Sequence, residues 1–435
     1  MRVKMLKIFS NEFWKKLVKN VATVLIGNGG ASLINLVVTF LMIKAIGNTG
    51  YGLIAIALQY MNLLDGIVNF QSWSGVIKYG SEARVANNRE NLYSIFKAGF
   101  LIDISTAILG GGVALAILPI ASDILEWQNE ILVMALFFSF EIFFHIEGTS
   151  IGVLRLYDKF KYTAAQSIIA ALIKLILIGG YVLLRGKSVL VITILYVITD
   201  IVKHLILVIM AIYVLHNNCG IKKVASASLK YVNKDFIKYT LWSNIALTVD
   251  VPVKYFDIFI IGQISVEMVA IYKVFKQMIQ MLSMLTNPIS MAILPQFSEL
   301  AALGKEKEAY DKVKKLRKII LEIGLVLILV SASIGKPVLT FVLGKEYGDN
   351  LLLFETLFVT SIYMISNTAV HPFCASLGLA KQDFYITLIT NLLYMLFAFA
   401  TVKIIGIYSV VLAYALQGTI FIWLKTAYIK KLGIG

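Results

Sequence analysis

The chain has 435 residues, of which 59% are hydrophobic and only 15% are charged, whereas a soluble globular domain is about 45–50% apolar and about 25% charged. This composition excludes an ordinary water-soluble enzyme and indicates a multi-pass membrane protein. A formal net charge of +15 would otherwise suggest a nucleic-acid partner, but in a membrane protein it reflects basic loops facing anionic lipid. We therefore expect membrane lipids, and no nucleic acid, among its partners.

Long apolar runs predict twelve transmembrane helices, because one span requires about 20 apolar residues. In chain order the predicted spans are 21–43, 51–73, 98–119, 131–153, 164–184, 189–213, 239–262, 268–295, 319–343, 351–376, 384–402 and 407–428. The six basic residues before the first span, and the length of that span, are not those of a cleaved secretory signal. We expect the first span to stay in the membrane.

The longest polar stretch, 216–238, divides the chain into two halves of six spans each. We predict an N-terminal lobe at 1–215, a cytoplasmic linker at 216–238 and a C-terminal lobe at 239–435. A faint internal repeat at an offset of 217 residues matches Ser81, Glu82, Tyr93 and Lys97 with Ser298, Glu299, Tyr310 and Lys314. The fold class expected is an all-α polytopic membrane protein, with about 12 transmembrane helices in two parallel-repeat lobes around a central cavity.

Basic residues are distributed unequally between the two sets of loops. With the N-terminus inside, 29 Lys and Arg residues fall in cytoplasmic segments and 5 in external ones. Cytoplasmic loops of membrane proteins carry the excess of Lys and Arg. This asymmetry predicts that both termini are cytoplasmic.

Charged residues inside the predicted spans are the strongest functional signal, because an ionisable group in hydrocarbon normally faces a cavity or a partner. In span seven Asp250, Lys254 and Asp257 share one helical face, and Pro252 between them favours a kink. This stripe either presents a cation and two carboxylates to a cavity or forms salt bridges within itself.

Lysines of the second half could bind a phosphorylated substrate. Span eight carries Lys273 and Lys276, and lysine binds phosphate as a point charge. A diphosphate requires two or more such cations. The predicted substrate-binding residues are Lys254, Lys273, Lys276 and Lys174; the alternative is that Lys254 and Lys273 extend to the membrane surface.

Buried carboxylates and histidines are typical of proton or cation relays. The candidates for ion coupling are Asp65, Asp257, Asp250, Glu141 and His145. In the alternative interpretation Asp257 only neutralises Lys254, and Asp200 only pairs with Lys203 or His204. Glu141 and His145 are too few for a metal site, no third ligand is visible nearby, and the two cysteines are isolated. We therefore expect no metal and no cofactor.

Seven short patterns occur in one order along the chain. They are GNTGYGL at 47–53, GVLRLYDKF at 152–160, DIFIIG at 257–262, VAIY at 269–272, LPQFSEL at 294–300, GKEY at 344–347 and LGLAK at 377–381. The ordered series resembles the polysaccharide transport family, which includes Wzx-type O-antigen flippases, within the multidrug/oligosaccharidyl-lipid/polysaccharide exporter superfamily.

The resemblance implies a non-enzymatic flippase in the bacterial cytoplasmic (inner) membrane. Its substrate would be an undecaprenyl-diphosphate-linked oligosaccharide, moved by alternating access and driven by a proton or sodium ion. Polysaccharide polymerase machinery would be a further partner. The alternatives are a drug or cation antiporter of the same superfamily and a membrane-embedded polymerase or ligase. Lysines inside the spans disfavour the antiporter, and short external loops disfavour the polymerase.

Overall fold

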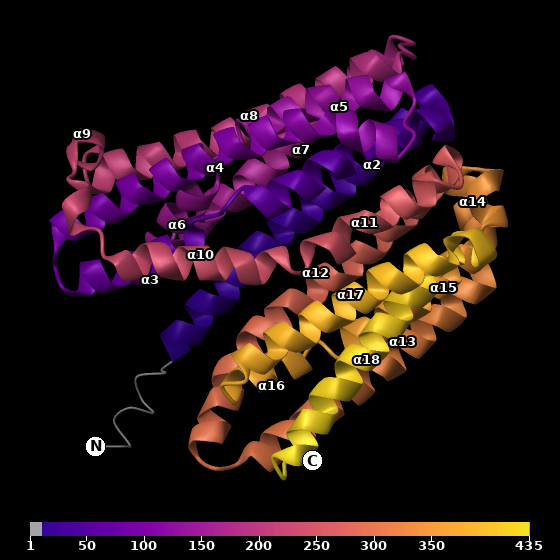
Figure 1. Ribbon diagram of the computed structural model, residues 1–435. Helices are drawn as coiled ribbons and strands as arrows, with labels where there is room; N and C mark the ends of the chain where they lie inside the picture. Colours follow the sequence, from indigo (N-terminus) through magenta and orange to yellow (C-terminus); the bar gives the residue numbers. More distant parts are fainter. Residues whose placement is uncertain (1–10, 435) are drawn as a thin grey trace. The chain divides into compact units, whose positions relative to one another are not determined.

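The computed structural model describes residues 11–434, with side chains for 22–434 apart from Ala246, 285–292, Pro295 and Ala380. This part of the chain folds into helices joined by short turns (Figure 1). The helices of the first half are α2 (Asn11–Val68), α3 (Trp73–Val85), α4 (Arg89–Ile124), α5 (Asn129–Ile142), α6 (Gly148–Leu156), α7 (Phe160–Leu183), α8 (Val189–Asn218) and α9 (Ile221–Ser226), followed by the 3-10 turn η1 (Leu229–Tyr231). Those of the second half are α10 (Lys234–Thr248), α11 (Val251–Gly262), α12 (Val266–Ala302), α13 (Glu306–Leu343), α14 (Lys345–Asp349), α15 (Leu351–Ser366), α16 (Val370–Ser376), α17 (Ala380–Ile405) and α18 (Tyr408–Lys431).

The chain divides into two compact units. The first contains the residues up to Ile46 together with Tyr60–Leu247, and the second contains Gly47–Gln59 together with Thr248–Gly435. The turn between predicted spans one and two is Gly47, whose φ of 72° interrupts α2 and is readily adopted only by glycine. The predicted lobes 1–215 and 239–435 remain a prediction, since the units assign 47–59 to the second and 216–247 to the first.

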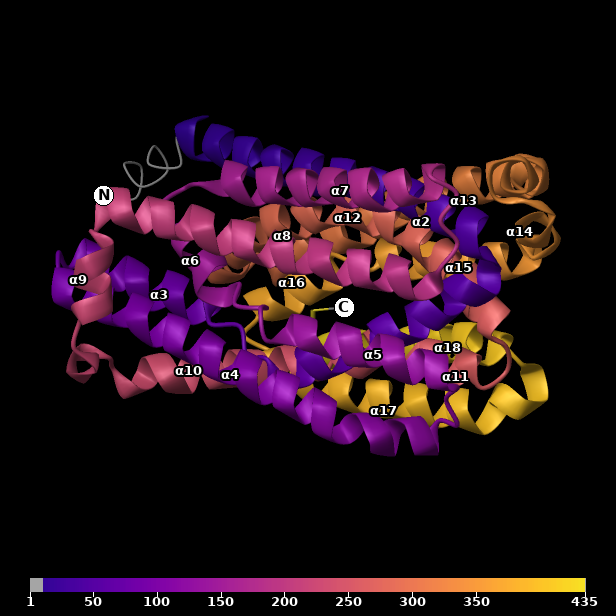
Figure 2. The same ribbon diagram turned by 90° about the horizontal axis from the view of Figure 1, so that it is seen from above.

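Many of the large apolar side chains point outward. Ile176, Phe341 and Trp423 are 68%, 91% and 65% exposed, as expected for helices that face acyl chains rather than water. Among the described residues, eight helical segments are long and apolar enough to cross a membrane. Within the units, α7 packs along α8 (Figures 1 and 2), and α17 packs along α18.

Three predicted spans, 131–153, 239–262 and 351–376, are interrupted rather than continuous, and a fourth break lies at the end of the span predicted at 51–73. The breaks lie at 69–72 between α2 and α3, at 143–147 between α5 and α6, at 249–250 between α10 and α11, and at 367–369 between α15 and α16. Pro252 lies in the first turn of α11, where its missing N–H is tolerated, so the kink expected in span seven is a complete break. Non-helical backbone at membrane depth is tolerated where protein buries it or where it lines a cavity.

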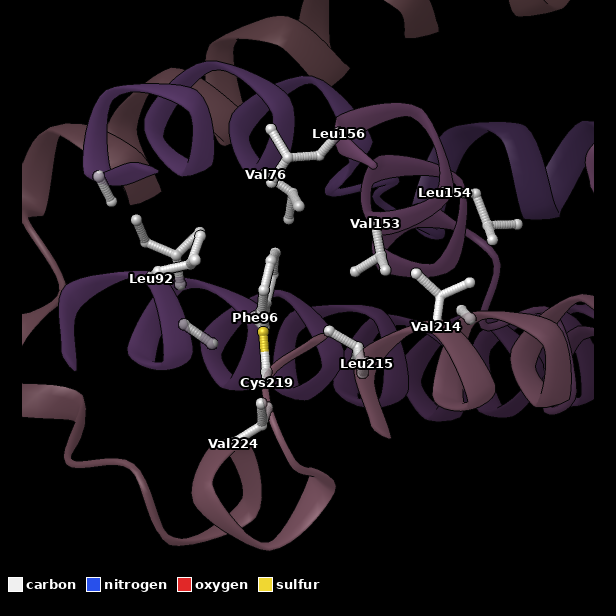
Figure 3. Close-up of a cluster of buried hydrophobic side chains, with 14 of the residues drawn as sticks. Val76, Leu92, Phe96, Val153, Leu154, Leu156, Val214, Leu215, Cys219 and Val224 are labelled. Atoms are coloured by element: carbon white, nitrogen blue, oxygen red, sulfur yellow. The ribbon is translucent and has the colours of Figure 1, made fainter. Parts of the chain in front are cut away.

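Each unit has a hydrophobic core that includes or contacts one tyrosine of the predicted repeat. In the first unit Val76, Phe96, Val153 and Leu215 meet between α3, α4, α6 and α8 (Figure 3), and Tyr93 packs against them. In the second unit Ile293, Phe297, Phe373 and Ile429 form a cluster that includes Tyr310, the repeat partner of Tyr93. One residue pair of the predicted repeat, Tyr93 and Tyr310, thus contacts a hydrophobic core in each unit.

Candidate functional site

The second unit contains a polar cavity of about 300 Å³. Its walls come from α11, α12, α15, α17 and α18, and its polar lining consists of Asp250, Lys254, Asp257, Tyr272, Lys276, Gln280, Ser283, Ser361, Asn391, Tyr394, Tyr414 and Gln417. Among the predicted site residues, Lys254, Lys276, Asp250 and Asp257 all line this one cavity. The polar stripe of span seven therefore faces a cavity.

Asp257 is the most heavily contacted charge in this cavity. Its side chain is buried, and it accepts hydrogen bonds from the Tyr272 hydroxyl at 2.8 Å and from the Lys276 ammonium. Lys276 also donates to the backbone carbonyl of Lys254 at 2.8 Å. The expected pairing of Asp257 with Lys254 is thus replaced by a pairing with Lys276 from the neighbouring helix.

Lys254 is the less constrained cation of the cavity. It is exposed and forms no ion pair with any of the residues that the structure describes. Lys273 lies one turn before Lys276 on α12 but does not line the cavity. Two of the three lysines predicted in the second half therefore face the same volume.

Asp250 lies at the break between α10 and α11, where an amide network replaces the missing helical hydrogen bonds. Asn391 donates to the Val249 carbonyl at 2.8 Å and to Asp250 at 3.3 Å. Gln417 donates in turn to the Asn391 side-chain oxygen at 3.0 Å. The sequence analysis missed Asn391 and Gln417, because single amides on α17 and α18 carry no signal until the fold brings them to Asp250.

Lys174 belongs to the first unit, where its ammonium lies 2.6 Å from Asp200 and 3.4 Å from the centre of the Tyr196 ring. Lys174 is buried, and the ion pair with Asp200 neutralises its charge. Asp200 pairs with Lys174 instead of the expected Lys203 or His204. The predicted grouping of Lys174 with the cavity lysines stays a prediction.

The three predicted coupling residues of the first unit lie in one buried cluster. His145 Nδ1 is 2.6 Å from Asp65, and Asn69 donates to Asp65 at 2.9 Å and to the His145 carbonyl at 2.9 Å. Glu141 lies 3.3 Å from His204 Nε2. His145 and Glu141 are therefore not paired with each other, although they stand one turn apart in sequence.

A second buried carboxylate joins the two helix breaks of the first unit. Asp103 on α4 is 1% exposed and accepts hydrogen bonds from the backbone N–H of Ser72 at 3.1 Å and of Thr149 at 2.5 Å. The Ser72 and Thr149 hydroxyls are 2.7 Å apart. Asp103 therefore holds together the chain segments at which α3 and α6 begin.

Two sequence comparisons relate the chain to known proteins. Residues 17–301 match the family model described as "Polysaccharide biosynthesis protein". The inner membrane protein YghQ of Escherichia coli (strain K12) is 26% identical over 161 residues, which are 36% of this chain and 44% of YghQ. The match thus spans less than half the length of that relative.

Two solved structures share the fold over nearly the whole chain. One is an inward-facing multidrug resistance MATE family transporter of the MOP superfamily, with a TM-score of 0.72, 13% identity, and coverage of 92% of this chain and 96% of that one. The other is the lipid II flippase MurJ in an inward closed conformation, with a TM-score of 0.66, 14% identity, and coverage of 93% and 87%. Both of these solved structures are of transport proteins.

The likeness to these structures confirms the predicted fold class of a helical, two-lobed, multi-pass membrane protein. The family match covers well over half of the chain and confirms the resemblance seen in the short patterns. The chain belongs to the polysaccharide biosynthesis protein family.

Proposed function

We propose that this protein is a flippase for an undecaprenyl-diphosphate-linked oligosaccharide, such as an O-antigen or other surface polysaccharide repeat unit used in lipopolysaccharide biosynthesis. It would act by alternating access in the bacterial inner membrane with both termini cytoplasmic, and polysaccharide polymerase machinery would receive its product. Family membership supports the polysaccharide pathway. The observation that carries the proposal is that Lys254 and Lys276 line one cavity of about 300 Å³.

The chemistry of the cavity suits a diphosphate headgroup next to a sugar. The Lys254 ammonium forms no ion pair with a described carboxylate and supplies a point charge for phosphate oxygens. Lys276 supplies a second one when phosphate replaces Asp257 as its partner. Tyr272, Tyr394 and Tyr414 add hydroxyls and aromatic surface around the same volume. Such side chains offer both hydrogen bonds and flat apolar contacts to sugar rings.

Ion coupling forms the second part of the proposal, with a proton or sodium ion bound at Asp257 or Asp250. Both carboxylates line the cavity that holds the two lysines. A shared cavity allows the ion and the anionic headgroup to influence each other's binding. The first-unit candidates Asp65, Glu141 and His145 remain a separate prediction.

The test is flipping of a fluorescent undecaprenyl-diphosphate oligosaccharide in vesicles that contain the purified protein. We expect Lys254→Gln to slow flipping about tenfold, which corresponds to about 1.4 kcal/mol. Lys403→Gln is the matched control, because Lys403 is exposed in the last turn of α17 and outside the cavity. Flipping at the wild-type rate by Lys254→Gln would contradict the proposed binding of the diphosphate in this cavity.

The alternative function is a drug or cation antiporter. An antiporter for cations is favoured by carboxylates, and Asp250 and Asp257 are available in the cavity. Uptake of a cationic dye driven by an ion gradient, together with no flipping of the diphosphate lipid, would favour this alternative.

A further inference from the structure

The first unit contains a cluster of histidines and carboxylates that the proposed function does not require. His145 and Glu147 lie in the break between α5 and α6, and His204 comes from α8. The potential ligand atoms of these three side chains all lie within 4.8 Å of one another. The two imidazole rings are close, with centroids 4.5 Å apart and planes inclined by 32°.

Each histidine directs one ring nitrogen toward Glu147. His204 Nδ1 is 2.7 Å from Glu147 Oε1, and His145 Nε2 is 3.7 Å from Glu147 Oε2. Because one carboxylate already contacts both imidazoles, small side-chain rotations would bring all three donors within reach of one ion. Two imidazoles and a carboxylate are a known zinc ligand set, which leaves a fourth coordination position open.

The other nitrogen of each histidine faces a second carboxylate. His145 Nδ1 is 2.6 Å from Asp65, and His204 Nε2 is 3.3 Å from Glu141. Histidines that bind metals almost always donate their remaining N–H to a carboxylate, a carbonyl or a water, and this contact fixes the ring and raises its basicity. Both imidazoles of the cluster therefore have the supporting contact that a metal ligand needs.

The charge balance also suits a dication. Asp65, Glu141, Glu147 and Asp200 supply four carboxylates, whereas Lys174 and Lys203 supply two ammonium groups. The remaining two negative charges are costly at membrane depth and require either two protons on the imidazoles or a bound cation. One divalent cation would replace the two protons.

One buried atom of the cluster is unsatisfied. Glu141 is 4% exposed, and its Oε2 has no hydrogen-bond partner among the described residues. A buried carboxylate oxygen is expected to have a partner. This oxygen therefore indicates that the cluster binds a further group, such as a cation or a water molecule.

We propose that His145, Glu147 and His204 bind a divalent transition-metal ion of the zinc class, with Asp65 and Glu141 orienting the two histidines. Imidazole ligands suit Zn²⁺, Cu²⁺, Ni²⁺ and Fe²⁺ better than Mg²⁺ or Ca²⁺. The ion joins α8 to the connection between α5 and α6 and stabilises the interrupted span. With the metal bound, Asp65, Glu141 and His145 are not available to bind the coupling ion. Asp250 and Asp257 are then the remaining candidates for ion coupling.

The experiment uses the purified full-length protein in detergent, stripped with a chelator and titrated with Zn²⁺ alone by calorimetry. We expect one Zn²⁺ per chain in the wild type, a loss of stoichiometric binding in His145→Gln and in His204→Gln, and binding weakened by about 10–100-fold in Asp65→Asn. His216→Gln is the matched control, because His216 is exposed on the same helix as His204 and should leave Zn²⁺ binding unchanged.

A second measurement remains informative if the histidine variants do not fold. Co²⁺ added to the stripped wild-type protein should produce the intense visible absorption of a four-coordinate site. Absence of that spectrum, absence of stoichiometric Zn²⁺ in the wild type, or retention of Zn²⁺ by both histidine variants would overturn the proposal. None of these readouts measures transport, so a failure here leaves the proposed flippase function untouched.

Discussion

The two units solve the problem of charge inside a membrane in different ways. In the first unit His145 contacts Asp65 and Glu147, Lys174 contacts Asp200, and these side chains are largely buried. In the second unit Lys254, Asp257 and Lys276 line a cavity of about 300 Å³. A closed polar cluster can hold helices in place, whereas an open one can bind a substrate. The two halves of the predicted repeat thus differ in how they use their charges.

The largest effect is expected at Asp103, which tests whether polar groups of the first unit are structural. Replacement of Asp103 by Leu would leave the N–H groups of Ser72 and Thr149 unsatisfied in a buried position. Each unsatisfied group costs about 1–3 kcal/mol, so we expect a large fall in the thermal unfolding temperature in detergent. Asp123→Leu is the control, because Asp123 is exposed near the end of the same helix. Equal unfolding temperatures for the two variants would contradict a structural role for Asp103.

The second effect concerns transport by the cavity of the second unit. Lys276→Gln removes one of its cations and the partner of Asp257, so we expect flipping to slow by at least about tenfold, or about 1.4 kcal/mol. Lys273→Gln sharpens the comparison, since Lys273 does not line the cavity, and its effect should be several times smaller. The measurement is the flipping rate of each variant in vesicles at equal protein content. A larger loss of rate in Lys273→Gln than in Lys276→Gln would contradict a binding site in this cavity.

The third prediction tests which of the two units contains the carboxylate that couples flipping to an ion gradient. Asp257→Asn keeps the size of the side chain but removes the charge that Lys276 and Tyr272 contact. We expect flipping by this variant to lose its response to an imposed proton or sodium gradient, whereas Asp65→Asn retains a response close to that of the wild type. The opposite pattern would assign coupling to the first unit.

The smallest effect is expected at Glu267 in the first turn of α12, before the predicted span 268–295. Hydrogen bonds from Thr49 at 2.7 Å and Ser265 at 2.8 Å lower the pKa of Glu267 below its usual 4.5. The charged carboxylate therefore stabilises the folded state above pH 4.5, and this contribution disappears as the pH falls through the lowered pKa. Since Glu267 is exposed, the stabilisation should be less than about 1 kcal/mol.

Thermal unfolding of wild type and Glu267→Gln between pH 7 and pH 3 measures this contribution. The difference between the two proteins should be present at pH 7 and should vanish at the lowest pH. A difference that grows as the pH falls would contradict the assignment.

The sequence alone determined the membrane class, the family and the charged face that span seven presents to the cavity. Apolar runs of about 20 residues can be satisfied only by spanning helices, because lipid offers no hydrogen bonds to the backbone. The spacing of Asp250, Lys254 and Asp257 predicted a shared face, and these residues line one cavity. These conclusions depend on the length of apolar runs and on helical spacing, and both can be read from the sequence.

Tertiary structure decided which charges are partners. Asp257 pairs with Lys276 across two helices rather than with Lys254 one turn away, and His145 pairs with Asp65, which lies 80 residues before it. Glu147 and His204 lie close to His145, so that their potential ligand atoms and those of His145 are all within 4.8 Å of one another. Hydropathy also does not show where a span is interrupted. The breaks before α3 and α6 depend on the buried Asp103, which accepts hydrogen bonds from the backbone there. Contacts between distant segments depend on how helices pack, and helix packing leaves no regular spacing in the sequence.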